Sequence, residues 1–107
     1  LTGQRVMKIF EAIETAYVQY TRRVQTAELN VTVRGIVEKN PPSRHLGRPN
    51  SVSYVTQTSV KPPTFVFFVR EPKAVLPSYE RYLANQLRDA LGFQYTPLRL
   101  IFRRKRR

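Results

Sequence analysis

The most informative stretch of this sequence is Lys61-Pro62-Pro63-Thr64-Phe65-Val66-Phe67-Phe68-Val69-Arg70. Residues 64–70 are rich in β-branched and aromatic side chains, which favour a strand. A run that is apolar on both faces is typical of the centre of a sheet rather than its edge. We therefore expect residues 64–70 to form the central strand. We expect its three phenylalanines to be core residues rather than platforms for base stacking.

A second strand is predicted just before this one, from Val52 to about Val60. The intervening Lys61-Pro62-Pro63 cannot lie inside a sheet, because proline has no N–H to donate. The two strands should therefore pair as an antiparallel hairpin. Residues 40–51, with three prolines and a glycine, are expected to form a loop.

After the central strand, a short connector over residues 71–77 leads to a helix that we expect Ser78 to cap and Gly92 to end. Pro97 then opens a last strand, residues 98–102. A strand, helix and strand in this order predict two parallel strands joined by a right-handed crossover. The inward stripe expected for the helix is Tyr79, Tyr82, Leu83, Gln86, Leu87, Ala90 and Leu91.

Two helices are predicted before the loop. In the first, which should end near Arg23, the apolar residues fall three and four apart, while Glu11, Glu14 and Gln19 should face water. Thr26 is expected to cap the second. That prediction has a competitor, since Leu29, Val31 and Val33 also alternate as in a strand, and Gly35 is a poor helix former. The apolar stripe of the first helix is Val6, Ile9, Phe10, Ile13, Tyr17 and Tyr20.

These elements predict an α+β domain in the order α-α-β-β-α-β, with a three-stranded mixed sheet and helices packed on one face. The arrangement approximates the core of a KH domain. A chain of 107 residues has room for one modest core.

The charge balance points to a polyanionic partner. Nineteen Lys and Arg residues stand against seven Asp and Glu, giving a formal charge of +12, and Arg outnumbers Lys by 14 to 5. Arginine presents a planar fork of donors that matches phosphate and stacks on bases, which favours RNA. Arg81, Asn85 and Arg88 would share one face of the third helix, where they form either a row of phosphate donors or a solvated surface.

Several kinds of site are not predicted. The chain has no cysteine, and the single His45 lies in a flexible loop, so we expect neither a metal site nor a catalytic base there. No phosphate-binding loop of the G-x-x-x-x-G-K-[ST] type and no G-x-S-x-G elbow occurs. No catalytic residue is therefore predicted, and the chain is not expected to be an enzyme. No membrane span or signal pattern is present in the sequence, so a cytoplasmic location is the expectation.

Linked blocks of sequence resemble the C-terminal domain of the EngA (Der) family of bacterial GTPases over nearly the whole chain. The strongest are Lys61-Pro62-Pro63-Thr64-Phe65-Val66, Ser78-Tyr79-Glu80-Arg81-Tyr82-Leu83-Ala84-Asn85-Gln86-Leu87-Arg88, Gly92-Phe93 and Pro97-Leu98-Arg99.

The resemblance implies a KH-like domain over residues 25–107 with a basic tail, preceded over residues 1–24 by a helix that continues from an upstream GTPase domain. It implies a role in ribosome biogenesis, with contacts to ribosomal RNA in the large subunit. The alternative is a protein-interaction module that senses the nucleotide state of the GTPase domains. GTP and Mg²⁺ would belong to those domains, and no cofactor is expected in this fragment.

One departure from standard KH domains affects the expected binding mode. The connector over residues 71–77 holds no G-x-x-G, the loop that clamps nucleotides through its backbone. Its absence favours either a charge-led contact with structured RNA, without DNA specificity, or a contact with protein. The residues predicted to contact RNA are Arg44, Arg48, Lys61, Arg81, Asn85, Arg88, Arg103, Arg104, Lys105, Arg106 and Arg107.

Overall fold

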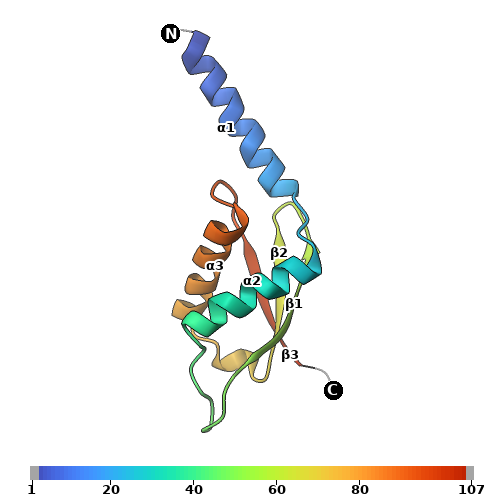
Figure 1. Cartoon of the computed structure of the whole chain (residues 1–107), viewed down its shortest axis with the longest axis vertical. Helices are drawn as coiled ribbons and strands as arrows, with labels where there is room; N and C mark the ends of the chain where they lie inside the picture. The colour runs from blue at the N-terminus through green and yellow to red at the C-terminus, as the bar shows by residue number, and fades with distance from the viewer. Residues whose placement is uncertain (1–2, 106–107) are drawn as a thin grey trace.

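The computed structural model describes the backbone of residues 3–105 and the side chains of residues 8–105. The predicted order of helices and strands is confirmed, with one added turn of 3-10 helix, η1, before the last helix (Figure 1). The elements are α1 (Gly3–Thr21), α2 (Thr26–Lys39), β1 (Val52–Ser59), β2 (Thr64–Val69), η1 (Pro72–Ala74), α3 (Pro77–Leu91) and β3 (Arg99–Arg104).

Strand β2 lies in the centre of a three-stranded sheet of order β1-β2-β3, as predicted. It pairs antiparallel with β1 and parallel with β3. The last strand runs from Arg99 to Arg104 rather than from 98 to 102. The physical reason is register: Thr64 to Val69 of β2 pair residue by residue with Arg99 to Arg104, so the strand continues into the basic tail.

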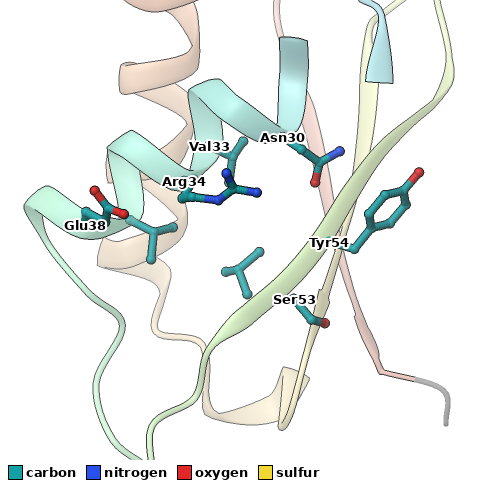
Figure 2. A pocket seen from close by; sticks show the side chains of 8 residues that line it. Asn30, Val33, Arg34, Glu38, Ser53 and Tyr54 are labelled. Carbon is teal, nitrogen blue, oxygen red and sulfur yellow. The ribbon is translucent and has the colours of Figure 1, made fainter. Parts of the chain in front are cut away.

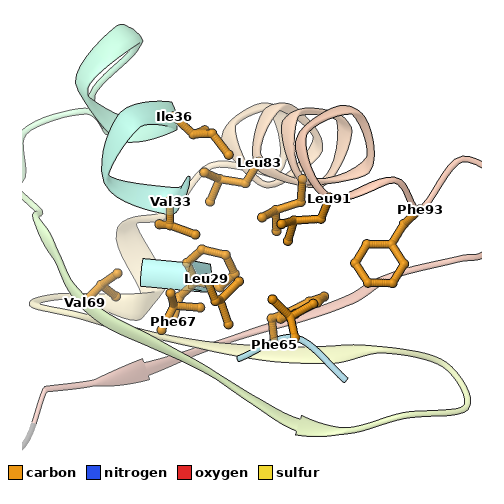
Figure 3. Close-up of a cluster of buried hydrophobic side chains, with 12 residues drawn as sticks. Leu29, Val33, Ile36, Phe65, Phe67, Val69, Leu83, Leu91 and Phe93 are labelled. Atoms are coloured by element: carbon orange, nitrogen blue, oxygen red, sulfur yellow. The ribbon is translucent and has the colours of Figure 1, made fainter. Parts of the chain in front are cut away.

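The core lies between the sheet and helices α2 and α3, which cover the same face (Figure 3). Phe65 and Phe67 are fully buried there, and each contributes about 2 to 3 kcal/mol through removal from water. The rings of Phe65 and Phe93 pack edge to face, with their centroids 6.1 Å apart. Phe68 is different, because its side chain points to the opposite face of the sheet and is half-buried.

The competition between helix and strand over residues 26–39 is settled in favour of a helix. Leu29, Val33 and Ile36 are buried against the core, whereas Val31 is 65% exposed. The spacing of three and four residues therefore prevails over the alternation, because only a helix places these three side chains on one face.

The predicted helix caps are corrected at two sites. The N-cap of α2 is Gln25 rather than Thr26, and that of α3 is Leu76 rather than Ser78. In α3 the reason is Pro77 at the first helical position, where its fixed φ suits a helix and its missing N–H costs nothing. The predicted stop at Gly92 is confirmed, with a left-handed φ of 77°. Ala90, predicted to face inward, is exposed.

Helix α1 projects away from the rest of the domain, which gives the molecule an elongated shape (Figure 1). Its apolar stripe is uncovered: Ile9, Ile13 and Tyr17 are each more than half exposed, and the side chain of Val6 lies outside the described residues. Gln19 was expected on the wet side and is instead buried. Its carboxamide oxygen accepts a hydrogen bond from the backbone N–H of Tyr95 at 2.8 Å, so the end of α1 is tied to the turn before β3.

Side-chain amides hold the segments of the domain together. Asn30 on α2 both donates to the carbonyl and accepts from the N–H of Val55 on β1, at 2.8 and 2.9 Å, and so covers part of the free edge of that strand. Asn50 makes the same pair of bonds with the backbone of Glu71. Gln57 accepts from the N–H of Val24 at 2.6 Å.

Two tyrosines of α3 satisfy carbonyl groups at the end of α2. The Tyr82 hydroxyl donates to the carbonyl of Ile36 at 2.7 Å, and the Tyr79 hydroxyl donates to that of Asn40 at 2.8 Å. The last carbonyls of a helix have no partner within the helix, so these bonds lock α2 against α3. Burial, and to a smaller extent the charge of Tyr82, raises the pKa of Tyr79 to about 12.

Replacing Gly35 by alanine should stabilise the domain by about 0.5 to 1 kcal/mol, since a Cβ at this exposed helical position meets no atom within 4 Å and alanine favours the helix. Gly92→Ala should destabilise it by about 1 kcal/mol, because only glycine adopts its positive φ without strain. Urea unfolding of the two variants measures both changes. Equal changes of the free energy of unfolding, in the same direction for both variants, would contradict this account.

The Tyr79 hydroxyl predicts a stability change in alkali. Because its folded-state pKa lies above the unfolded value of about 10, its contribution is complete below about pH 10 and is lost between pH 10 and about 12. The urea midpoint should therefore fall more steeply across this range in the native chain than in Tyr79→Phe. At neutral pH the variant should be about 1 kcal/mol less stable. If the urea midpoints of the two proteins fell in parallel above pH 10, the stabilising role assigned to the Tyr79 hydroxyl would be refuted.

Candidate nucleic-acid groove

An open groove of about 420 Å³ runs between α3 and the edge strand β3. The row of Arg81, Asn85 and Arg88 forms its helical wall, and Leu98 and Leu100 line its strand side. The helical spacing seen in the sequence is thus real, since all three side chains line one hollow. The two leucines were assigned to the last strand from the sequence and were not recognised there as groove residues, because only folding places β3 beside this face of α3.

The groove carries positive charge that is not neutralised within the domain. Arg81 and Asn85 are exposed, and Arg88 is half-buried with a weak contact to the Asn85 carboxamide at 3.4 Å. Across residues 8–105 the one ion pair joins Arg104 to Glu71 at 3.0 Å, so neither groove guanidinium is paired with a carboxylate. Glu80 is the acidic member of the lining and opposes an anion. Two guanidinium groups and an amide leave donors free for phosphate oxygens.

A second basic cluster lies at the end of the sheet where β2 and β3 finish. Arg70 donates to the carbonyls of His45 and Pro49, and it thereby holds the loop that carries Arg44 and Arg48. Arg70 also lines a hollow with Ser51, Arg104 and Lys105. Arg70 was not recognised from the sequence, although a charged residue directly after a buried strand is a signal that could have found it.

The remaining predicted contacts do not join the groove. Lys61 lies in the turn between β1 and β2, where its backbone N–H donates to the carbonyl of Tyr20 at 2.9 Å. Arg103 lies on the sheet face away from the helices, in register with Phe68. Arg106 and Arg107 fall outside the described residues. The nine predicted residues that the structure describes therefore belong to several surfaces, because sequence proximity to a basic run does not place side chains together.

A smaller hollow of about 110 Å³ lies between α2 and β1 (Figure 2). Arg34 and Glu38 project from α2 beside it, and Ser53 and Tyr54 belong to the strand. The amide of Asn30 is already bonded to the backbone of Val55, and Glu38 offsets the charge of Arg34 at this site. The α3–β3 groove is therefore the better anion site.

The connector before α3 uses its backbone groups internally. It contains the single turn η1, in which the N–H of Ala74 donates to the carbonyl of Glu71 and the N–H of Val75 donates to that of Pro72. These amides are not free to clamp a phosphate, which agrees with the missing G-x-x-G. Contacts in the groove would thus come from side chains.

Residues 8–105 bring together no trio of His, Asp or Glu side chains that could hold a metal ion. In the same part, none of the helices combines the length and the apolar character that crossing a bilayer requires.

Comparison with known proteins agrees with the fold. The family model for the KH-domain-like C-terminal part of EngA bacterial GTPase enzymes matches residues 23–103. A protein named GTPase Der from Moorella thermoacetica is 51% identical over 106 residues, which is 99% of this chain and 24% of that protein. The GTPase Der of Gloeobacter violaceus is 47% identical over 98% of this chain and 23% of its own length.

The GTPase Der of Desulfitobacterium hafniense strain DCB-2 is also similar, with 49% identity over 97% of this chain and 24% of that protein. The chain thus spans about a quarter of the length of these curated relatives. The family match covers α2, β1, β2, α3 and all of β3 except its last residue, which are the elements that form the core and the groove. This chain therefore belongs to the family of KH-domain-like C-terminal domains of the EngA bacterial GTPases.

Proposed function

We propose that this chain is the RNA-contacting accessory domain of a GTP-binding protein in the biogenesis of the large ribosomal subunit, and that its α3–β3 groove grips RNA phosphates. The observation that carries the proposal is the unpaired guanidinium pair of Arg81 and Arg88 along that groove. A formal charge of +12 would draw the domain toward RNA at long range. The link to the ribosome rests on the family resemblance.

In this proposal the domain performs no reaction of its own. Its curated relatives are named GTPases and are about four times as long as this chain. GTP and Mg²⁺ would be bound by GTPase domains in the same longer protein, and the protein would act in the cytoplasm. Residues 1–24 would continue from the last of those domains, and residues 25–107 would form the RNA-facing unit.

A specific feature also favours a contact with protein. Ile9, Ile13 and Tyr17 form an apolar stripe on α1 that the rest of the domain leaves uncovered. A continuous exposed apolar stripe on a helix is typical of a surface that packs against a partner. We propose that the adjacent GTPase domain is that partner. The domain could then transmit nucleotide state to the RNA surface.

The groove predicts a change in the salt dependence of RNA binding. Replacing Arg81 and Arg88 together by glutamine should lower the log-log slope of affinity against salt by about 1.8 for a paired RNA segment, since each phosphate contact to a duplex contributes about 0.9. Fluorescence anisotropy with ribosomal RNA fragments at several salt concentrations measures the slope.

The matched control for that experiment is Arg34→Gln with Lys39→Gln, which removes the same charge from exposed positions of α2 outside the groove. It should leave most of the slope in place. An equal loss in both double variants would show that net charge, and not the groove, governs binding.

The apolar stripe of α1 predicts a difference in amide exchange. In the isolated chain the amides of residues 9–17 should exchange rapidly, because α1 has little packing against the body of the domain. In the full-length protein the same amides should be protected. Comparing the exchange rates of these amides between the GTP-like and GDP states of that protein then tests whether the contact changes with the bound nucleotide. Equal rates in the isolated and full-length proteins would refute the contact.

A further inference from the structure

The sheet has one face that the helices leave uncovered. Side chains alternate along a strand, so Leu100 and Phe102 of β3 face the core, and Arg99, Ile101 and Arg103 face the other way. Lys105 continues this alternation, since its N–H donates to the carbonyl of Val69 at 2.9 Å. Figure 3 shows α2 and α3 on the opposite side of the sheet from this surface. We call it the open sheet face.

Two aromatic rings lie side by side on the open sheet face. Tyr54 of β1 pairs with Phe68 of β2, and their ring centroids are 6.2 Å apart with a tilt of 34° between the planes. Tyr54 is 45% exposed and Phe68 is half-buried. Together with Ser53 and Lys105 they line an open hollow of about 470 Å³. An aromatic ring that a strand holds exposed to solvent can stack with another flat ring, such as a base.

Cationic side chains border this aromatic pair. Arg103 is in register with Phe68, and Arg99 lies farther along β3 on the same face. Lys105 is two residues from Arg103, which is about 6.6 Å along the strand, so these two cations lie beside the rings. Arg99 is four residues from Arg103, about 13 Å, and extends the row toward the start of β3. None of the three strands, all of which lie within the described residues, contains an aspartate or a glutamate. The open sheet face therefore combines stacking surface with positive charge alone.

Exposed aromatic rings bordered by cations are typical of a surface that binds one class of partner. Single-stranded nucleic acid is bound where aromatic side chains stack with successive bases and a basic surface follows the phosphates. A duplex cannot use the rings, because its bases are already stacked. A protein partner would need an acidic apolar surface to match the cations, and nothing in the aromatic pair requires one.

We propose that the open sheet face binds unpaired RNA, with bases stacked on Tyr54 and Phe68 and phosphates held by Arg99, Arg103 and Lys105. The surface is separate from the α3–β3 groove, since it lies on the other side of the sheet. The inference rests on the proposed function only for its choice of RNA as the polyanion. The domain would then hold a paired segment in the groove and an adjoining unpaired segment across the sheet.

The test uses the 107-residue chain, a fluorescein-labelled ten-nucleotide RNA without secondary structure and a blunt RNA hairpin. Tyr54→Val with Phe68→Val keeps strand-forming side chains and removes both rings. Affinity for the ten-nucleotide strand should fall about tenfold or more, since loss of stacking on one base alone costs about that much. Affinity for the hairpin should change less than about twofold.

A matched control is Tyr95→Val, which removes an exposed tyrosine from the turn before β3 and should leave both affinities unchanged. A second measurement does not depend on weakened binding. Because the chain has no tryptophan, Tyr54→Trp places a single reporter on the open sheet face. Its fluorescence should be quenched by the unlabelled strand, while that of Tyr95→Trp should not be.

Unchanged affinity of the double valine variant for the strand, together with unquenched fluorescence of the Tyr54→Trp variant, would overturn the proposal and leave the face to a protein partner. The groove is tested separately by the same two RNAs. Loss of hairpin binding in Arg81→Gln with Arg88→Gln, with no effect of the valine pair on the strand, would uphold the groove and reject the open sheet face. The reverse pattern would uphold the face and reject the groove.

Discussion

Strand β2 is apolar on both faces, and the domain provides helices for only one of them. Phe65 and Phe67 meet α2 and α3 across the core, which accounts for the helical packing. The other face gains cover from its neighbours: Val66 is buried between Thr56 and Ile101, which are its register partners. Phe68 lies nearer the end of the strand and stays half-exposed beside Tyr54. Because β2 is apolar on both faces and helices cover only one of them, the same strand forms the core on one face and the open sheet face on the other.

Side-chain amides solve a second problem of this small fold. Segments that are not paired in the sheet still carry backbone groups that must find hydrogen-bond partners. Asn30 and Asn50 each bond to both the N–H and the C=O of one residue, as a neighbouring strand would do. Gln19 and Gln57 join the region around α1 to the turn before β3 and to β1. These residues are therefore structural, although a polar residue in a sequence is usually assigned to the surface.

The acidic residues all lie outside the sheet. Six of the seven are on helices and the seventh follows β2, whereas the strands hold no acidic residue and β3 carries Arg99, Arg103 and Arg104. The α3–β3 groove lies where these two regions meet, and Glu80 on its wall is part of the helical set. An RNA bound in the groove would meet some repulsion that the open sheet face does not exert. The α1 stripe adds a third, apolar surface, and under the proposals made above each of the three surfaces would meet a different partner.

The sequence alone was sufficient for the order of elements, the central place of β2 and the parallel pairing of β3, because these follow from local periodicity and from the run of residues 64–69. It also identified Arg81, Asn85 and Arg88 as one row, since a helical repeat is a local property. The burial of Gln19, the anchoring of the loop by Arg70 and the outward position of Phe68 were decided only by tertiary structure. Each depends on contacts between residues far apart in the chain, and no local pattern encodes which backbone carbonyl or which sheet face a side chain will meet.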